Sequence, residues 1–142
     1  MIWLLLAAAA AQPDCNKVKS AIAQDQCELA RSMTLDPAPN CVTRDTQFDM
    51  NICSFRDYLR ADIELNRNWG AIKQRLAGAS KAYGVMLAGQ KAWLAYRDKQ
   101  CEFWSGWYEG GSVAPAATNS CLLQITTTRA NELGKQLKDL DH

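Results

Sequence analysis

The sequence has almost no histidine, and this absence removes several classes of enzyme. Its single histidine is His142, whereas a Ser/His or Cys/His site needs an imidazole base held beside the nucleophile. Asp62, Glu64 and Asp98 supply carboxylates for a glycosidase-like pair. Asp62 and Asn66, however, have the four-residue spacing of a local pair on one helix, which favours a structural role. No Gly-rich phosphate loop follows a strand-like segment, and the sequence therefore predicts a protein without catalytic activity.

The chain also lacks an excess of charge and any Cys-x-x-Cys pair. Its 16 basic and 15 acidic residues give a net charge of +1, so the charge gives no reason to expect nucleic acid or a strongly charged partner. Without Cys-x-x-Cys, the usual zinc, thioredoxin-like and c-type haem sites are excluded. We therefore expect no metal, no cofactor and no nucleic-acid partner.

No apolar run is long enough to span a bilayer. Residues 2–11 form the longest run, and its length is typical of a signal-peptide core rather than of a membrane helix. Residues 7–11 are all alanine and offer cleavage positions, although the usual basic residues before the core are absent. The sequence predicts a signal peptide over residues 1–11 and one domain over residues 12–142 with no membrane span. A buried N-terminal helix is the alternative.

The cysteine count also indicates an exported protein. There are six cysteines, and an even number behind a signal peptide is typical of a disulfide framework in an oxidising environment. The protein is therefore expected in the periplasm or outside the cell.

Apolar residues recur at helical period through most of the chain, and no strand-like alternation occurs. The pattern predicts a short helix over residues 16–33 and three long helices over 45–76, 81–108 and 119–140, with Thr43 or Asp45 capping the first long one. Short connections between long helices favour antiparallel neighbours. The expected fold is all-α, a small disulfide-stapled antiparallel bundle of three long helices with a short N-terminal helix.

Helix geometry limits how the cysteines pair. Twelve residues on one helix separate Cα atoms by about 18 Å, whereas a disulfide needs about 4.4–6.8 Å. Cys41 can therefore reach Cys53 only from an extended segment before the helix, as can Cys15 with Cys27. The six cysteines allow about fifteen pairings, all of which remain open. We favour Cys15–Cys27, Cys41–Cys53 and Cys101–Cys121, the last pair flanking a Gly-rich loop.

Polar residues interrupt the apolar stripes. Gln90 and Arg97 share a face with apolar residues of the 81–108 helix, and buried polar groups need partners. A pair of Arg97 with Asp62 would join two helices. We predict a structural polar network whose members are Gln47, Asn51, Asp62, Asn66, Gln90, Arg97, Asp98 and Arg129.

Aromatic residues crowd the end of the same helix, immediately before the Gly-rich loop. Part of this cluster must be core, but a helix that is aromatic on adjoining faces can also present anchors to a partner. The predicted partner-binding residues are Trp107, Tyr108, Gly110, Gly111 and Ser112.

Several separated motifs resemble the lysozyme inhibitor LprI-like family, in its N-terminal domain form. The match runs over residues 41–137 and leaves residues 15–27 outside it. Its first signature corresponds to Thr46, Gln47, Met50, Asn51, Cys53, Tyr58, Ala61, Asp62, Leu65 and Asn66. Its second corresponds to Gln90, Lys91, Ala92, Trp93, Leu94, Tyr96, Arg97, Asp98 and Cys101, with Gly89 where alanine is usual. The loop and closing helix correspond to Gly110, Gly111, Ser112, Pro115, Cys121, Thr126 and Arg129.

The resemblance implies an all-helical, exported, disulfide-bonded domain that binds and inhibits lysozyme in the cell envelope. Most relatives in this family have no established role. A structural or adaptor protein of the envelope that does not bind lysozyme is therefore the alternative.

Overall fold

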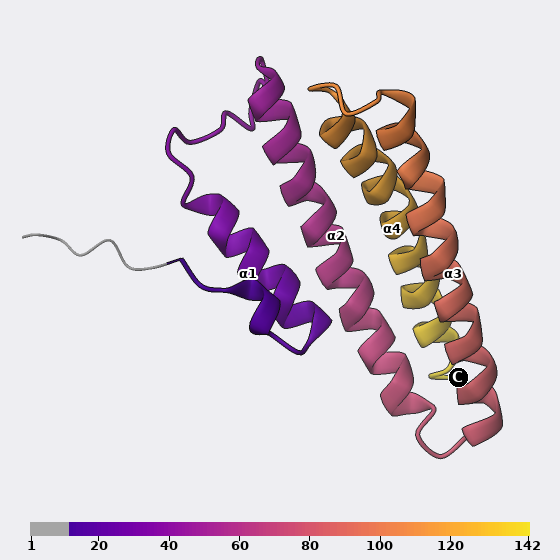
Figure 1. Ribbon diagram of the computed structural model, residues 1–142. Helices are drawn as coiled ribbons and strands as arrows, with labels where there is room; N and C mark the ends of the chain where they lie inside the picture. The colour runs from indigo at the N-terminus through magenta and orange to yellow at the C-terminus, as the bar shows by residue number, and fades with distance from the viewer. Residues whose placement is uncertain (1–11) are drawn as a thin grey trace, which may run out of the picture.

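The computed structural model describes residues 12–142, so the predicted signal peptide lies outside the described residues. Figure 1 shows a short 3-10 turn, η1 (Cys15–Lys17), followed by four helices. The helices are α1 (Ala21–Met33), α2 (Gln47–Arg75), α3 (Ser80–Trp107) and α4 (Ala114–Asp139). Residues 12–142 contain no strand, and the all-α prediction of three long helices and a short N-terminal one is confirmed.

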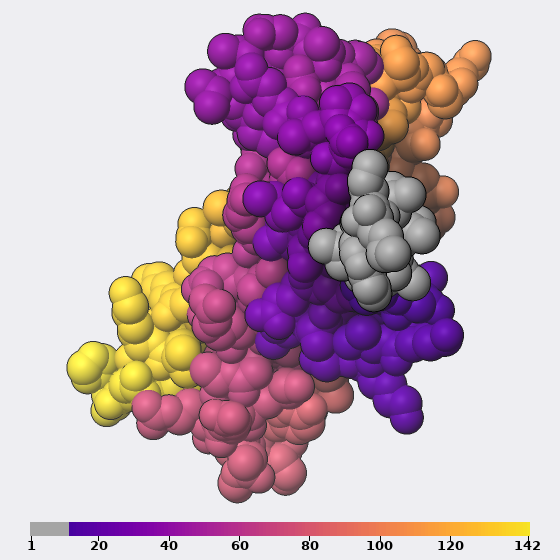
Figure 2. Space-filling view, turned by 90° about the vertical axis from the view of Figure 1, so that its left-hand side faces the viewer, coloured from indigo at the N-terminus to yellow at the C-terminus, as the bar shows by residue number. Residues whose placement is uncertain are grey.

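The long helices run down, up and down in Figure 1, and α4 packs against both α2 and α3. The shorter α1 packs against α2 on the side away from α3. Figure 2 looks at this side and shows the indigo residues of the N-terminal segment lying over part of α2. The three long helices therefore form the bundle, and α1 covers one flank of it.

The apolar core lies between α2 and α4. Four buried side chains form it: Leu65, Ile72, Ala130 and Leu133. The apolar stripe in the second half of α2 predicted the burial of the two that belong to α2, Leu65 and Ile72. Partly buried side chains surround this core, namely Trp69, Leu76, Met86, Trp93 and Leu137. The stripe is less buried at the start of α2, where Phe48 is 43% exposed. The fully buried apolar core is thus small for a bundle of this length, and other interactions must hold the other end.

The start of α2 differs from the expectation of a Thr43 or Asp45 cap. Thr46 is the N-cap: its hydroxyl accepts from the Asp49 N–H at 3.0 Å, and the Asp49 carboxylate accepts from the Thr46 N–H at 3.2 Å. This reciprocal pair is a capping box. Asp49 also accepts from the Asn40 N–H at 2.8 Å, and these hydrogen bonds hold the pKa of Asp49 below its usual range. The sequence signal was the Thr-x-x-Asp spacing.

The start of α4 also differs from the expectation. The helix begins at Ala114 rather than near Asn119, with Pro115 inside its first turn. A proline interrupts a helix interior but not a first turn, because the N–H groups there have no intrahelical acceptor. The loop between α3 and α4 is therefore shorter than expected.

Three disulfides close the chain near helix ends. Cys15 bonds Cys27 with a Cα–Cα distance of 5.7 Å. Cys41 lies in the turn before α2 and bonds Cys53 inside it, at 5.5 Å. The third joins the end of α3 to the start of α4, also at 5.5 Å. They constrain the N-terminal segment, the entry to α2 and the loop region, where the apolar core is thinnest.

A buried ion pair joins α2 to α3. Arg97 and Asp62 are each 8% exposed, and Arg97 Nη1 donates to Asp62 Oδ1 at 2.9 Å. The guanidinium lies between two aromatic rings, 5.7 Å from the Tyr58 centroid and 5.3 Å from that of Trp93. Both distances are within the range of cation–π attraction. Arg97 thus has aromatic and ionic partners that include residues of both helices.

Both partners of this pair make further hydrogen bonds. Arg97 Nε donates to Asp98 Oδ1 at 3.0 Å. Asp62 Oδ2 accepts from Asn66 Nδ2 at 3.0 Å. Each buried charged group therefore has hydrogen-bond partners at two of its atoms. A buried ion pair needs such additional hydrogen bonds to offset the loss of hydration.

Asp25 of α1 lies next to Asp62 of this ion pair. Burial, followed by a hydrogen bond with Asp62 and its charge, raises the pKa of Asp25 to about 8. Burial and the neighbouring Asp62 carboxylate therefore favour the neutral form of Asp25. Sequence reasoning missed it, although Ile22, Asp25 and Leu29 follow helical three-four spacing and place a carboxyl group in an apolar stripe.

Replacing Arg97 tests the junction. Arg97→Ala leaves Asp62 buried without its cation, and removing one partner of a buried pair costs about 3–5 kcal/mol. Urea unfolding of the oxidised protein should show this loss, whereas Lys99→Ala, on the exposed face of α3, should leave stability unchanged. A loss for Arg97→Ala no larger than for the Lys99 variant would show that the pair does not hold α2 to α3.

Asp25 should make stability depend on pH. Its carboxyl pKa is about 8 in the folded protein and 3.8 when exposed. The contribution of its neutral form is therefore complete below 3.8 and is lost as the pH rises through about 8. Asp25→Asn keeps a neutral donor, and should flatten the fall in unfolding free energy across this interval and stabilise the protein at pH 7. Parallel pH profiles of the two proteins would contradict this assignment.

Candidate functional site

The loop between α3 and α4 has a backbone that needs its glycines. Glu109 and Gly110 have φ angles of 48° and 73°, in the left-handed region that glycine adopts most easily. A Cβ on Gly111 would lie 3.0 Å from the carbonyl oxygen of Tyr108. The Gly111 N–H donates to that oxygen at 2.8 Å, so the two glycines set a tight turn.

Asn51 of α2 holds this loop against the bundle. Its Nδ2 donates to the Ser112 carbonyl at 3.0 Å, and its Oδ1 accepts from the Ala116 N–H at 3.2 Å. Gln47 Nε2 donates to the same Oδ1 at 2.8 Å. The Cys101–Cys121 disulfide fastens the two helices that flank the loop. The loop is thus fixed on both sides, at the end of the bundle where α2 begins (Figure 1).

Exposed aromatic rings adjoin the loop. Trp107 is 67% exposed and Tyr108 is 38% exposed. Trp107 stacks on Phe103 at 5.9 Å between ring centroids, and Tyr108 stacks on Trp104 at 6.2 Å. Figure 2 shows orange residues of this part of the chain projecting beyond their surroundings. A group of large exposed aromatics beside an ordered loop is typical of an interaction site.

The five predicted partner-binding residues therefore lie together at one end of the molecule, and we call them the loop end: Trp107, Tyr108, Gly110, Gly111 and Ser112. All five are exposed.

The structure divides the predicted polar network into three separate groups. Gln47 and Asn51 support the loop. The second group is the Asp62–Arg97 junction with Asn66 and Asp98. In the third, Arg129 of α4 donates from Nε to Gln90 Oε1 of α3 at 3.1 Å. Each group therefore joins a different pair of helices: the first joins α2 to α4, the second α2 to α3, and the third α3 to α4.

Arg56 is a buried residue that sequence reasoning missed. Its Nε donates to the Ser32 hydroxyl at 3.2 Å, and its Nη2 donates to the Ser32 carbonyl. These bonds tie the end of α1 to α2. Asp49, Cys53 and Arg56 are all buried and follow four-three spacing, which was the available signal.

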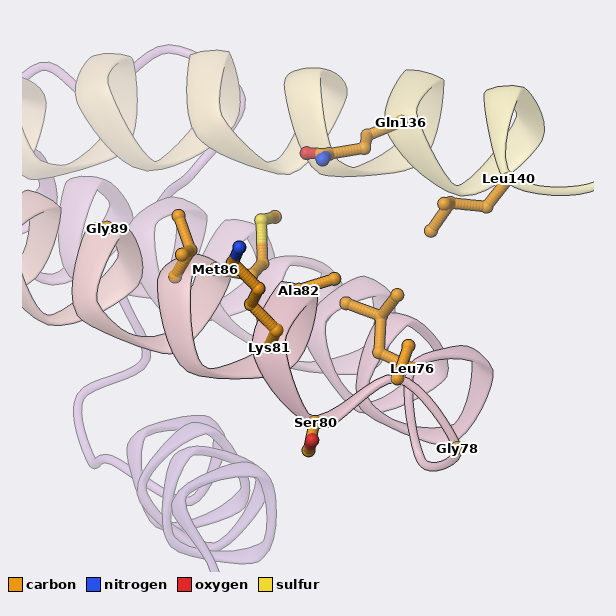
Figure 3. Close-up of a pocket in the computed structure, with 11 residues that line it drawn as sticks. Leu76, Gly78, Ser80, Lys81, Ala82, Met86, Gly89, Gln136 and Leu140 are labelled. Atoms are coloured by element: carbon orange, nitrogen blue, oxygen red, sulfur yellow. The ribbon is translucent and has the colours of Figure 1, made fainter.

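Among the surface hollows of the described residues, two are lined mainly by α3 and α4. One, of about 760 Å³, lies between α3 and α4. The other, of about 870 Å³, lies beside the turn between α2 and α3 (Figure 3). Figure 1 shows this turn at the end of the molecule opposite the loop end. Figure 3 shows Met86 and Ala82 of α3 facing Gln136 and Leu140 of α4 across it, with Leu76 near the turn. Its lining is mostly aliphatic and offers few groups for hydrogen bonding.

The described residues form no candidate metal centre. Among residues 12–142, no group of three or more His, Cys, Asp or Glu side chains could hold a metal ion. In the same part of the chain, every helix is too short or too polar to cross a membrane.

Asn51→Ala should loosen the loop without disturbing the disulfides. The change removes acceptor and donor atoms used by Ser112 and Ala116, and each lost hydrogen bond costs about 0.5–1.5 kcal/mol. Hydrogen exchange should become faster at the Ala116 amide, while Asn131→Ala, on the exposed face of α4, should leave it unchanged. Unchanged exchange in the Asn51 variant would mean that the disulfide alone fixes the loop.

Comparison with known proteins identifies the family. Residues 39–133 match the family described as lysozyme inhibitor LprI, a span that includes α2, α3, the loop end and most of α4. An uncharacterized protein of Rhizobium meliloti (strain 1021) is 30% identical over 127 residues, covering 82% of this chain and 91% of the relative. No solved structure matches the chain significantly. The chain therefore belongs to the lysozyme inhibitor LprI family.

Proposed function

We propose that this protein is an exported binding protein that inhibits lysozyme through the loop end and has no catalysis or cofactor of its own. Membership of the lysozyme inhibitor LprI family carries the proposal, because the matching span contains the whole loop end. The exposed aromatics and the fixed backbone of this region support it.

The loop end has the chemistry to meet a lysozyme cleft. Such a cleft holds two carboxyl groups that flank the sugar–sugar bond. In the described part of the chain, the N–H groups of Gly110 and Ser112 have no hydrogen-bond partner, and the Ser112 hydroxyl is a further donor. The N-terminus of α4 follows directly, with no acidic residue in its first turn, so its dipole also favours a carboxylate.

The rigidity of the loop end favours binding as well. Ordering a flexible loop on association costs free energy, which a preorganised loop avoids. Here Asn51, the glycine turn and the Cys101–Cys121 disulfide fix the backbone before any partner arrives. Trp107 and Tyr108 then supply apolar contact area with few rotatable bonds. Such aromatic anchors commonly dominate the binding energy of an interface.

Export is the second part of the proposal. Three disulfides within residues 12–142 suit an oxidising compartment. The apolar residues 2–11 would serve as the signal peptide that directs the chain there. The periplasm or the extracellular space is also where a protein would meet lysozyme.

The test is binding of the purified, oxidised protein to an animal lysozyme in calorimetry, with no peptidoglycan present. Trp107→Ala and Ser112→Arg should each weaken binding about tenfold or more, as loss of an interface anchor does. Val85→Ala and Ser80→Arg make matched changes at exposed positions at the other end of α3 and should bind like the wild type. Gly111 is unsuitable, because a Cβ there strains the turn.

Protection of a peptidoglycan suspension from lysis should follow the same order among these variants. Absence of binding by the wild-type protein, or equal loss in the loop-end and control variants, would contradict the proposal.

A further inference from the structure

The hollow between α3 and α4 has two chemically different walls, and we call it the α3–α4 groove. Its α3 wall carries residues at successive four-residue steps, which place them on one side of the helix: Tyr96, Gln100, Trp104 and Tyr108. Its α4 wall carries another four-residue series: Ser120, Gln124, Thr128 and Glu132. Ala117, Cys121 and Ile125 also line the α4 side. The α3 wall is therefore mainly aromatic, whereas the α4 wall, which we call the polar wall, carries most of the polar groups.

The aromatic wall presents ring faces along the groove. The rings of Trp104 and Tyr108 stack, with planes 24° apart and centroids 6.2 Å apart. Tyr96, one helical turn before Gln100, is 57% exposed. Between Tyr96 and Tyr108 the helix rises about 18 Å. The wall is therefore long enough for several rings of a linear ligand.

The polar wall supplies hydrogen bonds but almost no net charge. Its polar groups are two hydroxyls, a primary amide, the Arg129 guanidinium and one carboxylate, and Gln100 adds a second amide from α3. Both hydroxyls already donate to backbone carbonyls of α4, so they offer a ligand their acceptor lone pairs. The carboxylate belongs to Glu132, which is paired with Arg129 Nη1 at 2.9 Å. A ligand in this groove consequently meets donors and acceptors beside aromatic faces, with no excess of either sign.

We propose that the α3–α4 groove binds a neutral oligosaccharide. A pyranose ring has an apolar C–H face, which packs on an aromatic ring, and a rim of hydroxyls, which need donors and acceptors. Pockets that orient small ligands combine these same elements, aromatic surface with a few polar groups. This site shares only Tyr108 with the loop end, and the inference does not depend on lysozyme binding.

The composition of the groove argues against a helical peptide as its occupant. An amphipathic helix anchors itself through aliphatic or aromatic side chains in a continuous apolar groove. Ile125 is the one large aliphatic side chain of the α3–α4 groove, whereas the aliphatic hollow lies at the far end of the molecule (Figure 3).

The test is calorimetric titration of the oxidised protein with the β-1,4-linked tetramer of N-acetylglucosamine, in the absence of lysozyme. Tyr96→Ala removes one ring face and should weaken binding about tenfold. Gln124→Ala removes the amide of the opposite wall and should weaken it about fivefold. Thr127→Ala, on an exposed neighbouring position outside the groove, should bind like the wild type. The de-acetylated tetramer, which is cationic, should bind more weakly than the neutral one.

Trp107→Ala separates this proposal from lysozyme inhibition. Trp107 does not line the groove, so this variant should keep sugar binding, while Tyr96→Ala should keep lysozyme binding. Three results would overturn the sugar site. These are no heat of binding at millimolar tetramer, equal affinity in the wild type and the Tyr96→Ala/Gln124→Ala double variant, or loss of lysozyme binding with unchanged sugar binding in Tyr96→Ala. The last result would make the groove a protein interface instead.

Discussion

The buried pair of Arg97 and Asp62 is the interaction on which the arrangement of the helices depends most. Residues 12–142 bury few large apolar side chains completely, and these lie mainly between α2 and α4. The pair gives α3 a fixed position against α2. Because a buried charge without a partner is costly, a shift of either helix would be strongly opposed. Asp25, whose carboxyl group lies next to Asp62, extends the same junction to α1.

The fixed helices allow the bundle to hold its loop end in one conformation. α2 supplies Asn51 to the loop, and α3 and α4 supply the disulfide that closes it. The same two helices form the walls of the α3–α4 groove. Both proposed binding regions therefore use rigid helices to position exposed aromatics, and they lie close enough to share Tyr108. A protein that bound both lysozyme and a neutral sugar chain could protect a glycan by either route. Peptidoglycan lysis alone therefore cannot distinguish the two.

Much of the fold was predictable from the sequence, since helical periodicity gave the long helices and the polar residues in an apolar stripe predicted the pairing of Arg97 with Asp62. The helix ends were less predictable. Pro115 was taken as part of the loop, but its missing N–H costs nothing in a first turn. Thr46 was passed over as a cap, although its spacing from Asp49 is that of a capping box.

Contacts between segments distant in sequence were the hardest to foresee. The raised pKa of Asp25 depends on its burial and then on Asp62 in another helix. The hydrogen bond from Asn51 to the loop joins residues 61 positions apart. The α3–α4 groove needs two four-residue series from separate helices to face one another, which no local pattern specifies. The loop-end residues were chosen from sequence because a Gly-rich loop directly follows aromatic residues and lies between Cys101 and Cys121.

Hydrogen exchange of the oxidised protein, measured with and without lysozyme, tests the central claim most directly. The account predicts that protection on adding the enzyme concentrates at the amides of Gly110 and Ser112, whose N–H groups are free within the described chain. Protection confined to another surface, with these two amides unchanged at saturating lysozyme, would contradict it.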